Sequence, residues 1–258
     1  MKLMAKVSVF LFIVLFCTTA FAETISVRLA EWEAKFNMEL AVSKNYSAAT
    51  DITAKMIGLE MKKYTPALEI SFSGVILKTT LSYWDVTFGG ERTLDLGINF
   101  YGMQYDMNHA VESEIRITSY DLRWQFNLLP ISVVQLGVIA GARINRYSAQ
   151  ITDMTANFTA GDSAYAGAPY LGISAEVNVS SFQVGANIVS FSYKNEQAGF
   201  QLNRYMDTNL YAQMSLFPFV SARTGYYNFQ LDFETTGADA FRLGHYIKGP
   251  YLAICIGF

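Results

Sequence analysis

Histidine, cysteine and charge are scarce in this chain, and each shortage narrows what the protein can do. The 258 residues include two histidines and two cysteines, and charged residues make up 16%, whereas about 25% is usual in soluble domains. Cys17 lies in a predicted signal segment, so Cys255 has no cysteine to pair with and no disulfide is predicted. The net charge of −3 gives no basic surface, so we expect no nucleic-acid partner.

Sequence motifs for cofactors and catalysis are missing as well. HExxH, GxSxG, CxxC and the phosphate-binding glycine loop do not occur. We therefore predict no cofactor, no metal site and no catalytic residue, and we expect that the protein is not an enzyme.

Long apolar runs are absent after residue 22, although hydrophobic residues make up 52% of the chain. A membrane-spanning helix needs about 20 such residues in a row. Residues 1–22 have the form of a cleaved secretory signal, because Lys2 and Lys6 precede an apolar run and Ala20-Phe21-Ala22 is a cleavage site. We expect residues 23–258 to form one exported domain.

The sequence is rich in alternation of apolar and polar side chains with a period of two. Successive side chains of a strand point to opposite faces, so this pattern predicts β-strands. It is clearest in Tyr205–Leu216, and it recurs in Ala30–Leu40, Val133–Asn145, Tyr170–Val179 and Phe182–Ile188. A change of phase within 219–233 predicts a β-bulge near Tyr226-Tyr227.

Short turns between these strands alternate with long polar segments. Short periplasmic turns and longer outer loops are typical of outer-membrane barrels. We therefore predict a transmembrane antiparallel up-and-down β-barrel of about ten strands, with eight as the alternative. The long loops are expected at about 43–57, 89–113, 150–164, 194–204 and 234–244.

The C-terminal strand resembles the assembly signal of small Gram-negative outer-membrane β-barrel proteins. Tyr251, Ile256 and Phe258 occupy its aromatic and hydrophobic positions, and Ala253 replaces its glycine. The stretches Leu81–Gly90 and Tyr120–Trp124 are similar to a porin-like family in the style of the OmpW and OmpA barrels. The resemblance implies an outer-membrane location, insertion by the barrel-assembly machinery, and contact with lipid and lipopolysaccharide; we expect a monomer.

Charged residues predicted to face the lumen are the candidate site. Charges in a narrow lumen must pair to offset their desolvation, so they form either a plug or a narrow polar path. The set is Glu31, Glu33, Lys35, Glu39, Glu69, Lys78, Asp121, Arg123, Arg143, Glu176, Asp207 and Arg223.

Three functional hypotheses follow from these features. The first is a structural barrel or a narrow passive channel for small polar solutes. The second is a surface receptor or adhesion barrel acting through the 89–113 loop, whose Ile98–Met103 stretch is unusually apolar for a loop. The third is an outer-membrane hydrolase or lipid-modifying enzyme with a rim site at His245, near Asp232 and Glu234.

Overall fold

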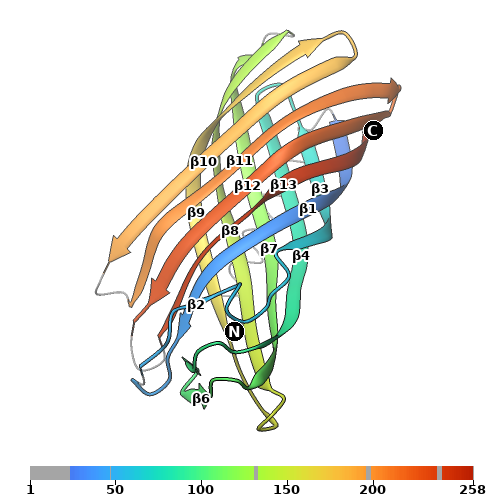
Figure 1. Cartoon of the computed structure of the whole chain (residues 1–258). Coiled ribbons are helices and arrows are strands. Elements are labelled where there is room, and N and C mark those ends of the chain that lie inside the picture. The colour runs from blue at the N-terminus through green and yellow to red at the C-terminus, as the bar shows by residue number, and fades with distance from the viewer. Residues whose placement is uncertain (1–23, 47, 131–132, 196–198, 237–239, 258) are drawn as a thin grey trace.

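In the part of the chain that the structure describes, ten long antiparallel strands form a closed barrel (Figure 1). The computed structural model describes residues 24–46, 48–130, 133–195, 199–236 and 240–257, so the predicted signal segment and Phe258 lie outside the described residues. The strands are β1 (Thr24–Val42), β3 (Lys62–Ser73), β4 (Leu77–Thr93), β7 (Ala110–Pro130), β8 (Val134–Asp153), β9 (Phe158–Val179), β10 (Phe182–Asn195), β11 (Phe200–Phe217), β12 (Val220–Thr235) and β13 (Phe241–Gly257).

Each long strand pairs with the next one along the chain, and β13 closes the ring on β1. The closing register runs from Ser26 opposite Gly257 to Val42 opposite Phe241. The predicted up-and-down barrel of ten strands is confirmed, and the alternative of eight is wrong. Three short strands lie in the long connections: β2 (Ile52–Thr53), β5 (Ile98–Phe100) and β6 (Met103–Tyr105). Across the described ranges, no helix has the length and apolar character needed to cross a bilayer.

Several long connections are shorter than the sequence predicts, because the strands continue past the expected loop boundaries; the first, between Val42 and Lys62, is longer than predicted. β8 and β9 remain paired up to Asp153 and Phe158, which reduces the predicted 150–164 loop to a turn. β4 and β7 likewise remain paired up to Thr93 and Ala110. Continued strand pairing provides hydrogen-bond partners for backbone N–H and C=O groups that in a loop would have to bond to water.

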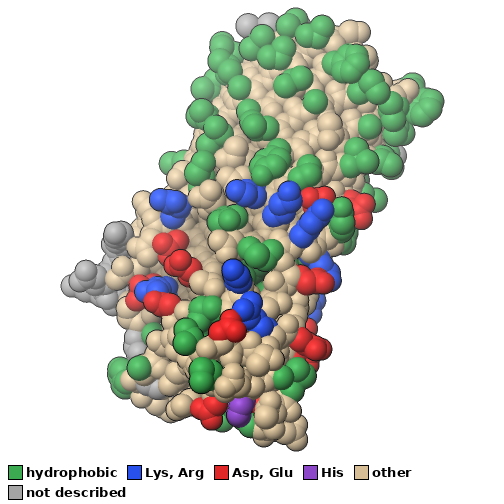
Figure 2. Space-filling view, viewed as in Figure 1, with side chains coloured by type: hydrophobic (Ala, Val, Ile, Leu, Met, Phe, Trp, Pro, Cys, Tyr) green, Lys and Arg blue, Asp and Glu red, His purple; other side chains and the backbone are tan. Residues whose placement is uncertain are grey.

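The barrel wall changes its character along its length. In the part nearest the short turns the outward side chains are apolar, as on β13, where Leu252 is 65% exposed. Figure 2 shows this end covered by apolar side chains, whereas charged side chains gather over the other part. Lys35 and Lys248, which pair across β1 and β13, lie near the boundary. We call the part on the short-turn side of this level the membrane half and the remainder the outer half.

The apolar face of strands that run through both halves, such as β12, reverses between them. On β12, Ala222 points outward in the membrane half, and Phe229 and Phe233 are buried inside the outer half. β12 pairs with β13 without a register shift from Val220 to Glu234, so the bulge predicted near Tyr226-Tyr227 is wrong. The phase changes because the medium outside the wall changes from lipid to water.

A packed apolar core fills the interior of the outer half. Phe36 and Phe88 stack with ring centroids 4.3 Å apart, and Phe229 packs edge-on to Tyr205 with centroids 5.7 Å apart. All four side chains are buried. The outer half is therefore built as a soluble β-barrel is, with its apolar residues inside.

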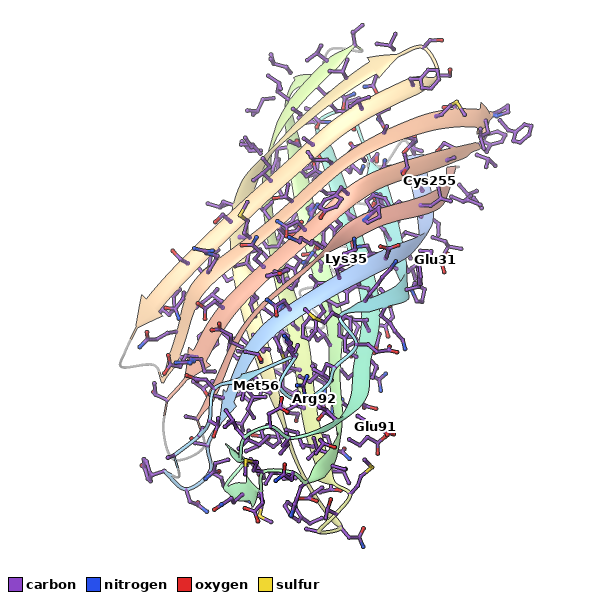
Figure 3. All side chains as sticks on the ribbon, viewed as in Figure 1. Glu31, Lys35, Met56, Glu91, Arg92 and Cys255 are labelled. Atoms are coloured by element: carbon purple, nitrogen blue, oxygen red, sulfur yellow. The ribbon has the colours of Figure 1, made fainter. Side chains whose placement is uncertain are left out.

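Residues 52–61 complete the wall where β3 and β4 separate. Phe36 N donates to Met61 O (2.9 Å) on one side, and Glu60 N donates to Gly89 O (3.0 Å) on the other. Gly58 has a φ of +72°, and a Cβ there would lie 2.6 Å from Glu91 O, so only glycine fits. The Met56 and Arg92 labels of Figure 3 mark this patch.

The connection between β4 and β7 closes the outer end. Ile98, Phe100 and Tyr105 are buried, and Tyr105 Oη donates to Ile151 O (2.8 Å). Tyr101 N donates to Val42 O (3.0 Å), which ties the connection to the end of β1. We call residues 94–109 the cap.

Candidate functional site: the charged lumen

The structure places most of the predicted lumen charges inside the barrel. Those that face the interior are Glu69, Lys78, Asp121, Arg123, Arg143, Glu176, Asp207 and Arg223. They come from seven strands and belong to two groups at different depths.

The prediction is wrong for the charges of β1. Glu31, Glu33, Lys35 and Glu39 lie on the outer face of the wall, and Figure 3 marks Glu31 and Lys35 on this strand. Their neighbours Trp32, Phe36 and Leu40 are buried instead. The physical reason is the reversal of faces, which on β1 takes place between Leu29 and Glu31: from there to the outer end the interior takes the apolar residues and the outer face takes the charged ones.

Two arginines and two aspartates form a buried cluster across the lumen. Arg143 Nη2 lies 2.6 Å from Asp207 Oδ2, and Arg143 Nε lies 3.4 Å from Asp121 Oδ1. Arg123 Nη2 lies 3.4 Å from Asp207 Oδ2 and 3.5 Å from Asp121 Oδ2. We call these four residues the Arg–Asp cluster. Its formal charges cancel, as burial requires.

Tyrosines from two further strands donate hydrogen bonds to the carboxylates of the cluster. Tyr170 Oη donates to Asp121 Oδ1, and Tyr227 Oη donates to Asp207 Oδ2, each at 2.7 Å. The Arg143 guanidinium also lies over the Phe229 ring, 4.8 Å from its centroid. The cluster therefore joins β7, β8, β9, β11 and β12 across the interior and leaves little freedom for the side chains between them.

An aromatic layer separates the Arg–Asp cluster from the outer-half core. Trp32 contacts Trp84 and Tyr227 edge-on, with centroids 5.7 and 5.0 Å away. A small cavity of about 70 Å³ lies against Trp32, Arg123 and Arg143. The layer and the cluster together fill the middle of the barrel.

On the short-turn side of the cluster the lumen opens into a polar vestibule. It consists of two adjoining hollows of about 540 and about 360 Å³, which share Thr24, Ser73, Lys78 and Gln183 in their walls. We call this space the vestibule. Its other charged lining residues are Arg28, Glu69, Glu176 and Arg223.

Most vestibule charges have close partners. Arg28 forms an ion pair with Glu69, and Tyr211 Oη donates to Glu176 Oε2 (2.6 Å). Arg223 Nε donates to Gln213 Oε1 (2.7 Å), and its guanidinium lies 4.1 Å from the centroid of the Tyr211 ring.

Sequence reasoning missed Arg28 because it took the other face of β1 as the inner one. The signal that could have found it is the position of Glu69 directly opposite on β3. Two opposite charges at one level of an apolar wall point to an inward-facing pair.

His245 is not a rim residue. Its side chain is buried in the outer-half core, with Nε2 2.9 Å from Tyr147 Oη, and burial lowers its pKa to about 3. Asp232 lies beside Gly244 on the opposite face of the wall. Successive side chains of a strand point to opposite sides of the wall, so His245 points inward, whereas Asp232 and Glu234 point outward. The predicted pairing of His245 with Asp232 or Glu234 is therefore wrong.

The other histidine and the remaining cysteine lie at opposite ends of the barrel. His109 Nδ1 lies 2.7 Å from Asp153 Oδ2 at the outer tip, and Cys255 is buried beside the vestibule. No group of three or more His, Cys, Asp or Glu side chains suited to a metal ion occurs in the part of the chain that the structure describes.

The predicted assembly-signal residues divide between the two faces of β13. Tyr251 points inward, and its Oη donates to Asn209 Oδ1 (3.0 Å), whereas Ile256 points to the lipid face. Phe258 lies outside the described residues. The role of these residues in assembly stays a prediction.

Comparison with known proteins shows which proteins share this fold. No family model matches this chain, and no curated protein matches it. The outer membrane protease OmpT from Escherichia coli matches with a TM-score of 0.62 at 10% identity, over 92% of this chain and 97% of that one. The transport unit of the autotransporter AIDA-I from Escherichia coli gives a TM-score of 0.41 at 8% identity, over 92% and 91%. The translocator domain of the autotransporter NalP from Neisseria meningitidis gives 0.39 at 11% identity, over 99% and 97%.

The comparison corrects one prediction. We predicted that the protein is not an enzyme, on the absence of catalytic motifs, but the same fold carries an outer membrane protease. The barrel architecture therefore gives no ground for excluding catalysis, and at 10% identity the match shows the fold alone. The chain has the fold of the Gram-negative outer-membrane β-barrel proteins, and its apolar girdle fits that membrane.

Proposed function

We propose that the protein is a closed structural barrel that holds a water-soluble head above the outer leaflet, and not a passive channel. The observation that carries this proposal is the filled interior of the outer half. A solute path would have to cross the Arg–Asp cluster, the layer at Trp32 and Trp84, and the core at Phe36 and Phe88, all of them packed.

The energetics of these barriers favour a plug. A solute passing the cluster would have to separate buried opposite charges, and removing one partner of such a group costs about 3–5 kcal/mol. Beyond the cluster it would meet a packed and mostly apolar core, in which polar groups such as His245 and Tyr147 bond to each other and do little to replace its hydration. The cap adds a further layer, with Phe100 fully buried against the end of the barrel.

Single-channel recording in a planar bilayer tests the closed barrel. The refolded protein, shown to be folded by heat-modifiable gel migration, should give no steady conductance where a general porin in the same bilayers conducts. Steady conductance that changes in Arg143→Gln or Glu176→Gln would overturn the proposal, because those side chains would then line an open path.

Surface recognition through the cap is a second candidate, and the arrangement of its apolar side chains favours it. Leu96 and Met107 are 65% and 56% exposed at the outer tip. Leu94, Ile98 and Phe100 of the same segment are buried and hold it in place. A segment that is anchored yet exposes large apolar side chains presents a preformed surface to a partner.

The recognition hypothesis is tested by changing the exposed side chains and keeping the anchors. Cells that display the protein would be measured for binding to a panel of immobilised extracellular glycoproteins. The double variant Leu96→Ser, Met107→Ser should lose binding, and the matched variant Val75→Ser, Ile76→Ser at the short-turn end should keep it. Wild-type cells that bind no member of the panel, or a cap variant that binds equally, would remove this candidate.

We also infer that the barrel-assembly machinery inserts the chain, that it works as a monomer, and that lipopolysaccharide surrounds it. Support for the lipid partner is a set of exposed cationic side chains on the outer wall, namely Lys35, Lys62, Arg116 and Lys248, the first three of which also pair with Glu33 or Asp85. Cations at this height can pair with the phosphates of the outer leaflet.

A further inference from the structure

One lysine in the vestibule, Lys78, forms no hydrogen bond or ion pair with any described residue. Lys78 lines both hollows of the vestibule. The nearest register neighbours of Lys78 are Ser73 on β3 and Gln125 on β7, neither of which carries a charge. The lysine therefore leaves the hydrogen-bonding capacity of its Nζ available to a ligand in this space.

The other charges of the vestibule are already matched. Glu69 pairs with Arg28, and Glu176 accepts hydrogen bonds from Tyr211 Oη and from Asn178 Nδ2 (3.3 Å). Arg223 rests on the Tyr211 ring and donates to an amide oxygen. Among the described lining residues, three cations stand against two carboxylates, which is an excess of positive charge, and walls of low dielectric constant strengthen its attraction for anions.

Amide side chains and hydroxyl groups make up much of the remaining lining. Gln125, Asn127, Gln135 and Gln183 surround the smaller hollow, with Ser73 and Thr24 at its mouth. Amides offer both donors and acceptors, which is what neighbouring hydroxyl groups of a ligand require. A hollow of about 360 Å³ is in the size range of small-molecule sites.

We propose that the vestibule binds a small anionic sugar, with its phosphate or carboxylate on Lys78 Nζ and its hydroxyl groups on the surrounding amides. The ligand enters from the short-turn end, because the Arg–Asp cluster and the aromatic layer close the other direction. In an outer-membrane protein that end faces the periplasm. The proposal does not depend on the function of the cap.

Isothermal titration of the protein in nanodiscs of phosphatidylcholine tests the proposal. Glucose 6-phosphate is the probe, and glucose and inorganic phosphate are the comparison ligands. We expect glucose 6-phosphate to bind about tenfold more tightly than either comparison ligand. Glucose lacks the phosphate that would contact Lys78, and inorganic phosphate lacks the sugar hydroxyl groups that would contact the amides. No detectable binding of glucose 6-phosphate, or equal binding of inorganic phosphate, would overturn the assignment of an anionic sugar.

Two lysine variants locate the site. Lys78→Gln should weaken binding by about tenfold or more, because a charge-assisted bond is lost, and Lys78→Arg should retain it within a few fold. The matched control Lys248→Gln, on the outer wall, should bind as the wild type does. Unchanged binding in Lys78→Gln would contradict the proposal. If that variant does not fold, Gln183→Ala replaces it, and unchanged binding there would count equally against the site.

Discussion

On β13, Leu252 and Ile254 point outward into the apolar band, whereas Leu243 and Ile247 of the same strand point inward. The strand neither bulges nor loses its register with β12 between these pairs. The membrane half and the outer half therefore share one backbone geometry and use its two faces in opposite ways. The comparison teaches that the inner face of a barrel strand cannot be assigned from alternation alone, because the medium outside the wall decides which face is apolar.

The two halves also differ in what fills them. The vestibule of the membrane half is polar and open, and the outer half holds a packed core rich in aromatic rings. Burial of apolar area from water contributes about 25 cal/mol per Å², so the outer half can obtain its stability from its own interior as a soluble domain does. The membrane half has its apolar residues against lipid, and it obtains its stability from those lipid contacts.

The largest expected effect comes from breaking the Arg–Asp cluster between vestibule and core. Asp207→Ala leaves Arg143 buried without its closest partner, and we expect a loss of about 3–5 kcal/mol in the free energy of unfolding. Urea unfolding in lipid vesicles, followed by tryptophan fluorescence, measures this loss.

The control for the cluster is an exposed ion pair of the outer half. Glu60→Ala removes the partner of Lys63 at the surface and should cost at most about 1 kcal/mol. Similar losses in the two variants would show that the cluster is not the buried network described above.

A charge placed on the outer face should distinguish the halves directly. Ile254→Arg puts a cation against lipid and is expected to cost about 2–4 kcal/mol. Tyr246→Arg, on the same face of the same strand in the outer half, should cost less than about 0.5 kcal/mol. Equal costs at the two positions, in the same vesicle assay, would mean that the wall meets the same medium along its whole length.

The smallest expected effect lies at the outer tip and depends on pH. Burial raises the pKa of Asp153, but the Ala156 and Thr155 backbone N–H groups and His109 lower it more, so the pKa lies below the ordinary value. A depressed carboxyl pKa stabilises the folded state above the unfolded pKa, and the contribution is lost as the pH falls through the folded pKa.

Comparison of Asp153→Asn with wild type at pH 7 and pH 3 measures this contribution. The variant should be less stable than wild type at pH 7, and the difference should shrink at pH 3. A difference that is the same at both pH values would exclude the ionised carboxylate as its cause.

Much of the fold follows from the sequence, because period-two alternation and turn spacing do not depend on which face is inside. The inner positions of charges such as Arg223 and Glu176 follow from taking the apolar face of each strand as the lipid side, which holds in the membrane half. The β1 charges Glu31, Glu33 and Lys35 were misplaced because the apolar set of that strand was assigned to lipid, although it fills the outer-half core. Arg28 was missed through the same error.

The cap and the filled outer half could not be predicted, since they depend on contacts between segments distant in the chain. Tyr105 reaches Ile151, and residues 52–61 bridge β1 and β4. Nothing in the apolar 98–103 stretch alone distinguishes a ligand-binding loop from a lid on the barrel.

The central claim is that the faces of the strands reverse where the wall leaves the membrane, and spin-label accessibility along β13 tests it most directly. In a Cys255→Ala background, nitroxide labels would be placed one at a time at 242, 246, 250 and 254, all on the outer face, with the protein in lipid vesicles. We predict that labels at 254 and 250 are accessible to oxygen from the lipid, whereas those at 246 and 242 are accessible to a water-soluble nickel complex. Lipid accessibility at all four positions would contradict the account.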